Sequence, residues 1–215
     1  MKLLCISASN IEPFRQQSAS TRACRIAAEL AAERAALEWD LLTLIDYELL
    51  PCRMCGRCLE SGRCCRDEAF NQVYARMQSA DAVLVVVPHY APIPSKVAML
   101  CEKLQEMAFL NSCRDSHYRG PLHGKPVGVI AHGGQTDEAL AYYYKNLALP
   151  VASALAGVGM RPVGSGEEMP YGAVFGIRAL HMPAENDIFC TIEHDWDAIR
   201  TRLAPLVDNL VAAAV

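Results

Sequence analysis

The residues best suited to chemistry in this sequence are cysteines that crowd one short segment. Of the ten cysteines in the 215-residue chain, five lie between positions 52 and 65, in the pattern Cys52-x2-Cys55-x2-Cys58-x5-Cys64 with Cys65 adjacent. Iron-sulfur clusters are held by sets of four cysteine thiolates, and short spacings let successive sulfurs point into one loop. The spacing therefore predicts a four-thiolate site, and a [4Fe–4S] cluster is the ligand that it favours.

Other uses of this segment stay open from the spacing alone. Zinc also accepts four thiolates, although its usual pattern is two CxxC pairs separated by a longer stretch. The cysteines could also form disulfides or act as free redox thiols. Because Cys64 and Cys65 are neighbours, Cys65 is the substitute candidate for the fourth ligand position. The five cysteines outside the segment are scattered, and we expect them to be structural thiols.

Four arginines interleave with these cysteines, namely Arg53, Arg57, Arg63 and Arg66. Positive charge favours thiolates and the reduced, more negative form of a cluster, so it should raise the reduction potential. The same charges would attract an acidic redox partner over a long range. The alternative interpretation is that they only keep an exposed loop soluble.

The composition excludes several classes of protein. Hydrophobic residues make up 52% of the chain and charged residues 20%, which is unlike a disordered protein. A net charge of −4 gives no basic footprint for nucleic acid. No apolar run approaches the roughly 20 residues of a membrane helix, and the first run turns polar at Ser7, too soon for a signal peptide. We therefore expect a cytoplasmic protein that binds neither nucleic acid nor membrane, with its thiols reduced.

The elements that must position the cysteines alternate between strand and helix. Apolar runs and capping residues predict strands at 2–7, 39–44, 82–87, 126–131 and 160–163, and helices at 20–37, 67–79, 95–109, 136–156 and 195–213. Such alternation implies an α/β fold with a parallel sheet and helices on both faces. We treat residues 1–215 as a single domain, with a cysteine-rich insertion at 46–66 and an irregular excursion plus a C-terminal helix at 164–215.

Ligands of open parallel sheets bind beyond the carboxyl ends of the strands, which directs attention to the loop after the first strand. Hydroxyls and free N–H groups at a helix N-terminus bind anions. The spacing GxGxxG is absent after this strand, which argues against a Rossmann dinucleotide site. The alternative is that Ser20 and Thr21 only cap the helix. The candidate residues are Ser9, Arg15, Ser18, Ser20 and Thr21.

Two further loops are candidates for a planar ligand. The loop after the third strand is stiffened by prolines and forms an apolar ledge, whereas the loop after the fourth is small and lets a ligand approach the backbone. An ordinary strand-to-helix turn is the alternative for the fourth loop. The candidate residues are Pro88, His89, Tyr90, Ala91, Pro92 and Ile93 in the third loop, and Ala131, His132, Gly133, Gly134 and Gln135 in the fourth.

As an ordered set, these loops resemble the NADPH-dependent FMN reductase branch of the flavodoxin-like fold over roughly residues 1–164. The counterparts are Ala8-Ser9, Arg15, Ala19-Ser20-Thr21, Pro88-His89-Tyr90 with Ser95, and Gly133-Gly134. The sequence departs from that family at Ala8, where glycine is usual, and in a longer first loop. The cysteine spacing soon after the second strand resembles the iron-sulfur flavoprotein family, which is built on the same frame.

The resemblance implies a flavodoxin-like, doubly wound, five-stranded parallel sheet of order 2-1-3-4-5, with a cysteine-rich loop after strand 2. It further implies FMN and a [4Fe–4S] cluster, with Cys52, Cys55, Cys58 and Cys64 as ligands, in a homodimer or homotetramer. The predicted function is an FMN-dependent oxidoreductase that passes electrons between cluster and FMN, from a ferredoxin-like or NAD(P)H donor to a small-molecule acceptor. No side chain is expected as an obligate acid, base or nucleophile.

Two other functions are consistent with the same residues. One is an NAD(P)H-dependent FMN or quinone reductase whose cysteine loop binds zinc or is empty. The other is a non-enzymatic electron carrier of flavodoxin type, or a redox sensor that uses Cys64 and Cys65. His181, His194 and Asp195 lack metal-ligand spacing with a third partner, and we interpret them as surface or cap residues.

Overall fold

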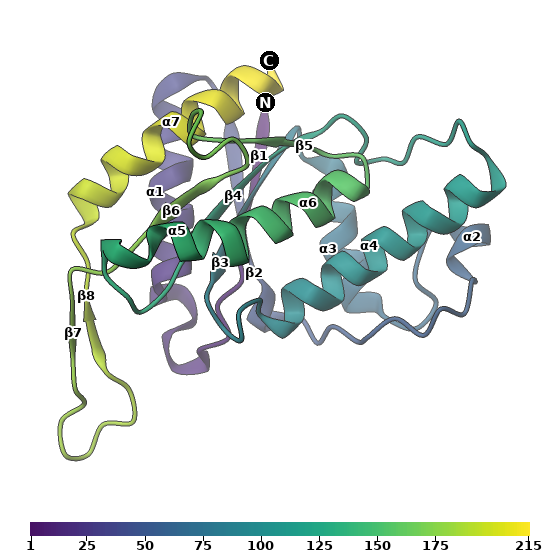
Figure 1. Cartoon of the computed structure of the whole chain (residues 1–215). Helices are drawn as coiled ribbons and strands as arrows, with labels where there is room; N and C mark the ends of the chain where they lie inside the picture. Colours follow the sequence, from purple (N-terminus) through teal and green to yellow (C-terminus); the bar gives the residue numbers. More distant parts are fainter.

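A parallel β-sheet forms the centre of the molecule (Figure 1). The computed structural model describes the whole chain, residues 1–215, apart from the side chain of Arg15. The sheet runs in the order β2-β1-β3-β4-β5, with β6 also paired to β4. Its strands are β1 (Lys2–Ser7), β2 (Glu38–Thr43), β3 (Ala82–Pro88), β4 (Pro126–His132), β5 (Arg161–Val163) and β6 (Ala173–Phe175). This order belongs to the flavodoxin-like fold.

The sheet has six strands, so the prediction of five is wrong in number. β5 pairs in parallel with the first half of β4, from Pro126 to Gly128. β6 pairs in parallel with the second half of the same strand, from Ile130 to His132. The position beside β4 is therefore shared by two short strands, because the chain leaves the sheet after Val163 and returns at Ala173.

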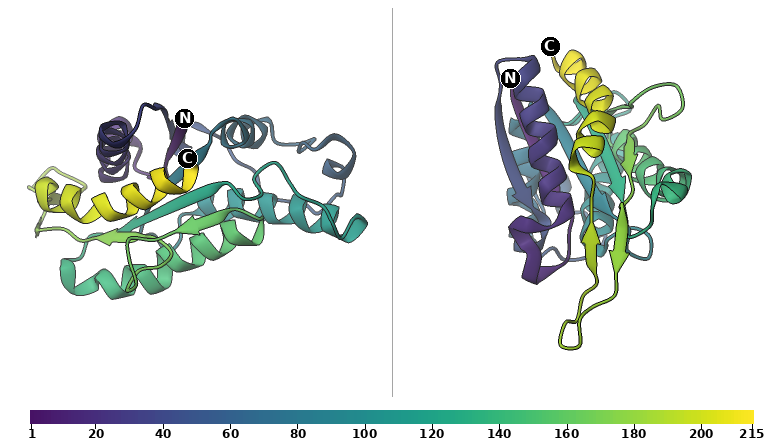
Figure 2. Two further views of the ribbon diagram at one scale, coloured as in Figure 1. Left: turned by 90° about the horizontal axis from the view of Figure 1, so that it is seen from above. Right: turned by 90° about the vertical axis from the view of Figure 1, so that its left-hand side faces the viewer.

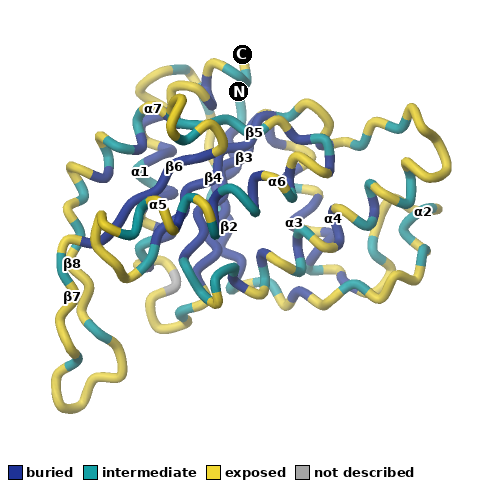
Figure 3. The backbone as a smooth tube through the Cα atoms, in the orientation of Figure 1, coloured by how far each residue is buried: buried dark blue, intermediate teal, exposed yellow. Residues whose placement is uncertain are grey.

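Helices cover both faces of the sheet (Figure 2). On one face α1 (Ala19–Arg34) packs beside α7 (Trp196–Ala214). On the other face lie α3 (Glu68–Ser79), α4 (Ser95–Arg114) and α6 (Leu149–Gly157). Every residue of β3 and β4 is consequently buried, as their unbroken apolar runs predict for strands covered on both faces (Figure 3).

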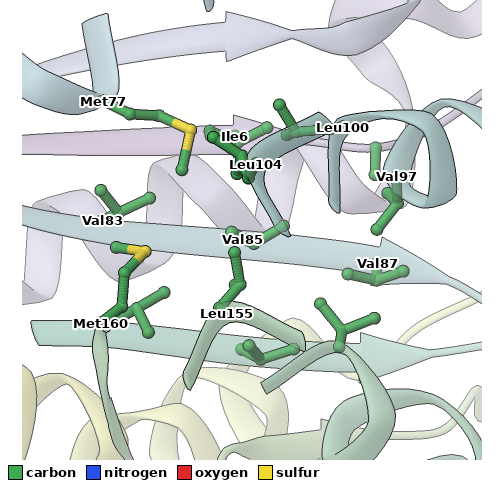
Figure 4. Close-up of a cluster of buried hydrophobic side chains, with 14 of the residues drawn as sticks. Ile6, Met77, Val83, Val85, Val87, Val97, Leu100, Leu104, Leu155 and Met160 are labelled. Carbon is green, nitrogen blue, oxygen red and sulfur yellow. The ribbon is translucent and has the colours of Figure 1, made fainter. Parts of the chain in front are cut away.

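The core against α4 and α6 shows how alternate strand residues find partners. Val83 and Val85 point from β3 toward this layer, where Leu104 and Leu155 lie close to them (Figure 4). All four side chains are at most 3% exposed. Burial of apolar side chains of this size contributes roughly 1.5–3 kcal/mol each, which holds α4 and α6 firmly on the sheet.

Helix boundaries differ from the predictions in two places. α4 continues to Arg114, five residues beyond the predicted end at Phe109. The predicted helix at 136–156 is instead a succession of a 3-10 turn η3 (Asp137–Ala139), α5 (Leu140–Tyr143), a π-helical turn η4 (Tyr144–Ala148) and α6. Pro150 has no N–H for the preceding turn, and the widened π-helical turn ends two residues before it, at Ala148.

The excursion after β5 is more regular than predicted. It contains β6 and an antiparallel hairpin of β7 (Ala179–His181) and β8 (Thr191–Glu193), which projects from the body at the lower left of Figure 1. The two strands of this hairpin have three residues each and are largely exposed, so they show no hydrophobic period that could predict them. α7 follows, and Pro205 lies inside this helix without ending it.

Candidate functional site

A cavity of about 700 Å³ opens beyond the carboxyl ends of β1, β3 and β4. It brings together residues from all three predicted loops and adds a wall from residues 187–196 of the C-terminal excursion. The predicted residues that line it are Ser9, Ser18, Ser20, Pro88, His89, Tyr90, His132, Gly133 and Gly134. Thr21, Ala91, Pro92, Ile93, Ala131 and Gln135 are not among the lining residues, and the side chain of Arg15 lies outside the described part of the chain.

The loop after β1 is fixed by hydroxyl groups around the start of α1. Ser18 caps the helix, since its Oγ accepts a hydrogen bond from the backbone N–H of Thr21 at 3.2 Å. The hydroxyl of Thr21 turns inward to within 2.9 Å of the Ser7 Oγ and 3.0 Å of the Ser18 Oγ. Thr21 therefore ties α1 to β1, whereas Ser18 and Ser20 face the cavity beside the positive end of the helix dipole.

His132 joins the ends of α1 and β4 under the cavity. Its Nε2 lies 2.8 Å from the Oγ of Ser20, and its ring stacks on Phe175 at 4.7 Å between centroids. Burial lowers the pKa of His132 to about 3, and the nearby His194 acts in the same direction. The imidazole is therefore neutral at pH 7, and it positions Ser20 without contributing charge.

The loop after β4 depends on a glycine that faces Tyr143. A Cβ at position 133 would overlap the Tyr143 hydroxyl, whereas a Cβ at Gly134 would meet no atom within 4 Å. The same hydroxyl accepts a hydrogen bond from the backbone N–H of Gln135 at 2.9 Å. Gly133 thus lets Tyr143 hold the loop in a shape that leaves backbone exposed to the cavity.

The loop after β3 turns sharply beside the cavity. The N–H of His89 donates to the carbonyl of His132 at 2.7 Å, which continues the pairing of β3 with β4. The N–H of Tyr90 then donates to the carbonyl of Pro92 at 2.7 Å, and Ala91 between them has a positive φ of 54°. This turn leaves Pro88, His89 and Tyr90 at the cavity.

Sequence reasoning missed the wall formed by the C-terminal excursion and by Arg22. The Arg22 guanidinium lies 4.3 Å from the centre of the Trp196 ring, and His194 stacks on the same ring at 4.6 Å. His194 is half-buried, and within the described part of the chain its buried Nε2 has no hydrogen-bond partner, so its interpretation as a surface residue is wrong. Asp195 does cap α7, accepting from the N–H of Ala198 at 3.0 Å.

The cysteine segment forms a second site, away from this cavity. Five thiols line one small hollow of about 30 Å³ against α4 and the short helix α2 (Cys58–Ser61). In the described chain all of them are unpaired thiols. The five are Cys52, Cys55, Cys58, Cys64 and Cys65.

The backbone of the segment turns its N–H groups toward sulfur. Met54 and Gly56, on either side of Cys55, have positive φ angles of 49° and 70°. The N–H of Met54 donates to the Sγ of Cys52 at 3.4 Å. The N–H of Arg57 lowers the pKa of Cys55, whereas burial raises the pKa of Cys58, with the charges of Cys52, Cys55 and Cys64 adding to that rise. These thiols are therefore close enough to interact electrostatically.

Polar side chains of α3 and α4 hold the segment in place. Asn71 accepts from the N–H of Cys64 at 2.8 Å and donates to the carbonyl of the same residue at 2.9 Å. Glu102 accepts from the N–H of Cys52 at 2.9 Å. Because both helices pack on the sheet, the cysteine backbone is anchored to the core at two separate points.

The donor chemistry of this hollow fits an iron-sulfur cluster. Within the described part of the chain, no three His, Cys, Asp or Glu side chains are arranged to hold a single metal ion. The hollow gathers five thiols around a shared space, and four thiolates are the set that a cluster requires. Cys52, Cys55, Cys58 and Cys64 all lie on it, as does the substitute Cys65.

Comparison with known proteins decides the family. The model of the NADPH-dependent FMN reductase family matches residues 1–166, well over half of the chain. The chain belongs to the NADPH-dependent FMN reductase family. The family supports FMN as the cofactor of this chain. The match ends before the hairpin and α7, and no helix of the described residues is long and apolar enough to cross a membrane.

Curated relatives confirm the resemblance to iron-sulfur flavoproteins. The iron-sulfur flavoprotein of Methanosarcina thermophila is 34% identical over 64 residues, 30% of this chain and 33% of that protein. The iron-sulfur flavoprotein of Methanocaldococcus jannaschii is 28% identical over 137 residues, 63% of this chain and 66% of that protein. The chain thus spans less than two thirds of the length of either relative.

A solved structure confirms the fold. The crystal structure of RosB with a bound riboflavin-phosphate intermediate aligns with a TM-score of 0.66 at 15% identity. The alignment covers 100% of this chain and 79% of RosB. At this identity the likeness concerns the fold alone.

Proposed function

We propose that this chain is an FMN-dependent oxidoreductase that passes electrons between a [4Fe–4S] cluster and FMN. The observation that carries the proposal is the hollow lined by five thiols, in a chain of the NADPH-dependent FMN reductase family. Two relatives that carry the name iron-sulfur flavoprotein support it. We keep Cys52, Cys55, Cys58 and Cys64 as the proposed ligands.

The proposed FMN site is the 700 Å³ cavity. Ser9, Ser18 and Ser20, beside the N-terminus of α1, would hold the phosphate through hydroxyl and N–H groups. The ledge from Pro88 to Tyr90 and the backbone at Gly133 and Gly134 would flank the ring system. Arg15, Thr21, Ala91, Pro92, Ile93, Ala131 and Gln135 stay predictions as cofactor residues.

The cofactors supply the electron transfer, and the protein supplies position. When bound, FMN exchanges one or two electrons and a cluster exchanges one. The residues of this chain bind and orient these groups: His132 fixes Ser20, Tyr143 fixes the loop after β4, and Asn71 fixes Cys64. We assign no side chain as an obligate acid, base or nucleophile.

The partners and the assembly follow as parts of the proposal. We propose a ferredoxin-like or NAD(P)H donor, a small-molecule acceptor, and a single 1–215 domain that forms a homodimer or homotetramer. The cysteine loop beside α2 and the hairpin that walls the cavity lie at opposite ends of the molecule, as Figures 1 and 2 both show. We propose that the subunits pack so that the cysteine loop of one chain lies near the cavity of another.

A single-turnover experiment tests this function. Under anaerobic conditions the bound flavin is mixed with reduced ferredoxin or with NADPH, in the wild type, in Cys55→Ala and in the control Cys113→Ala. Cys113 is exposed and lies outside the cysteine segment. We expect Cys55→Ala to lose flavin reduction by ferredoxin, and Cys113→Ala to behave as wild type. Equal ferredoxin rates in both variants would contradict the proposal, and rapid reduction by NADPH alone would support the simpler reductase.

A further inference from the structure

An ion pair lies buried directly behind the cysteine segment. The side chains of Lys103 and Asp67 are 3% and 1% exposed, and the ammonium bonds to the carboxylate. A buried pair gains little stability over apolar side chains of the same size, because both charges lose their hydration. Fold stability alone therefore does not account for a buried ion pair at this position.

The pair ties the two ends of the cysteine segment together. The Nζ of Lys103 donates to the carbonyl of Leu50 and to the Oδ2 of Asp67. The carboxylate of Asp67 also accepts from the N–H of Leu50 and from the N–H of Phe70, both at 2.8 Å. Leu50 stands two residues before Cys52 and Asp67 two residues after Cys65, so this network closes the loop that carries the five thiols.

Lys103 also faces the thiols themselves. Its side chain lines the hollow that the five cysteines share, together with a neighbouring hollow of about 70 Å³ that Cys52 and Cys64 border. Asp67 borders only the second hollow. An ammonium has three N–H donors, and Leu50 and Asp67 account for two of them.

We propose that Lys103 closes the cysteine loop and donates its third N–H to a sulfur of the bound cluster, which raises the reduction potential of that cluster. The inference rests on the proposed function, since it presupposes a cluster in the hollow. Hydrogen bonds to the sulfurs and nearby charge are the levers by which a protein sets the potential of an iron-sulfur centre.

Burial makes Lys103 more effective than the arginines of the segment. Arg53, Arg57, Arg63 and Arg66 are exposed, and water and salt screen their charges. Lys103 is buried, so its field at the hollow is screened less. Asp67 opposes the charge of Lys103, but only Lys103 of this pair lines the cysteine hollow, so the positive end of the pair is the nearer one. The carboxylate of Glu106 also lines the hollow, and it is the same in the wild type and in every variant compared below.

The test compares Lys103→Gln and the double variant Asp67→Asn/Lys103→Gln with the control Lys96→Gln. Lys96 lies on the same helix and donates to the carbonyls of Leu44 and Ile45 at 3.1 and 2.8 Å, away from the hollow. Lys103→Gln alone leaves the buried charge of Asp67 without its partner, whereas the double variant removes both charges. If the single variant does not fold, the double variant therefore decides the outcome. Iron and sulfide per chain, thermal unfolding and a spectroelectrochemical titration are measured on each protein after anaerobic purification.

At a fixed potential, we expect the ratio of reduced to oxidised cluster in the iron-loaded double variant to be about tenfold lower than in the wild type. For a one-electron centre, this corresponds to a reduction potential that is about 59 mV lower. Lys96→Gln should match the wild type. A double variant that keeps its iron and the wild-type potential overturns this inference and leaves the proposed function standing. A wild type without iron and sulfide overturns both.

Discussion

Burial sets the protonation of individual side chains in this protein, and His132 is the clearest case. The ring lies between Ser20 and Phe175, and burial lowers its pKa to about 3 from an ordinary value of 6.5. The unfolded chain therefore binds a proton between these two pH values that the folded chain does not bind. Stability is fully present above pH 6.5 and falls as the pH is lowered toward 3.

This difference predicts the pH dependence of a variant. Replacing His132→Gln keeps a hydrogen-bonding group for Ser20 but removes the titration. We expect the wild type to lose about 1.4 kcal/mol per pH unit relative to the variant between about pH 6 and pH 4. Urea unfolding at several pH values measures this, and parallel stability curves for the two proteins would show that His132 is not held neutral.

At the scale of elements, the shape of the loop after β4 depends on its contact with Tyr143, on α5. Gly133→Ala would push a methyl group into the Tyr143 hydroxyl and disturb its bond to the N–H of Gln135. Gly134→Ala meets open space and serves as the matched control. Since steric overlap of this kind costs about 1–3 kcal/mol, we expect roughly tenfold weaker FMN binding in Gly133→Ala.

The binding of FMN to these two variants is measured by the quenching of flavin fluorescence. Gly134→Ala should bind FMN as the wild type does. Equal affinities in all three proteins would mean that the loop after β4 does not contact FMN. Weakened binding in Gly134→Ala alone would place the ligand on the other side of that loop.

The elements also show what can be predicted from a sequence. The long apolar run of β3 and the helices α1 and α7 have strong periodic or capping signals, and each lies within a few residues of its prediction. The hairpin of β7 and β8 has none, because its three-residue strands are largely exposed and show no hydrophobic period. His194 and Trp196 line the cavity only because that hairpin returns across it, and their spacing in the sequence reveals nothing of this.

At the cysteine hollow, too, some residues could be predicted from the sequence and others could not. The spacing predicts which residues gather, and Cys52, Cys55, Cys58 and Cys64 do line one hollow. Of the residues that hold them, Asn71 on α3 lies seven residues after Cys64, whereas Glu102 lies 50 residues after Cys52 and Lys103 lies 53 residues after Leu50. Tertiary packing brings Glu102 and Lys103 to the loop, so no local pattern could identify these two.

At the scale of the whole molecule, the four exposed arginines of the cysteine segment lie at one end, where Arg63 pairs with Glu68 at 3.0 Å. Arg57 is exposed beside the hollow, and the control Arg178 lies on the hairpin at the other end, in an ion pair with Glu193 at 3.4 Å. If these arginines attract an acidic donor, Arg57→Glu should slow reduction by ferredoxin about tenfold at low salt, whereas Arg178→Glu should not.

Stopped-flow rates at increasing ionic strength test this attraction. The difference between Arg57→Glu and the wild type should shrink as salt screens the charges. A rate for Arg57→Glu that equals the wild-type rate at low salt would remove the steering role. The arginines would then serve only to keep the loop soluble.

Analysis of the cofactors in anaerobically purified protein tests the two-centre proposal most directly. FMN, iron, acid-labile sulfide and zinc are measured per chain, together with the visible spectrum, for the wild type and Cys55→Ala. We expect FMN with four iron atoms and four sulfides in the wild type, the composition of a [4Fe–4S] cluster. Cys55→Ala should lose the iron and the sulfide and keep FMN. Zinc or no metal in the wild type, or iron and colour retained in Cys55→Ala, would contradict the proposal.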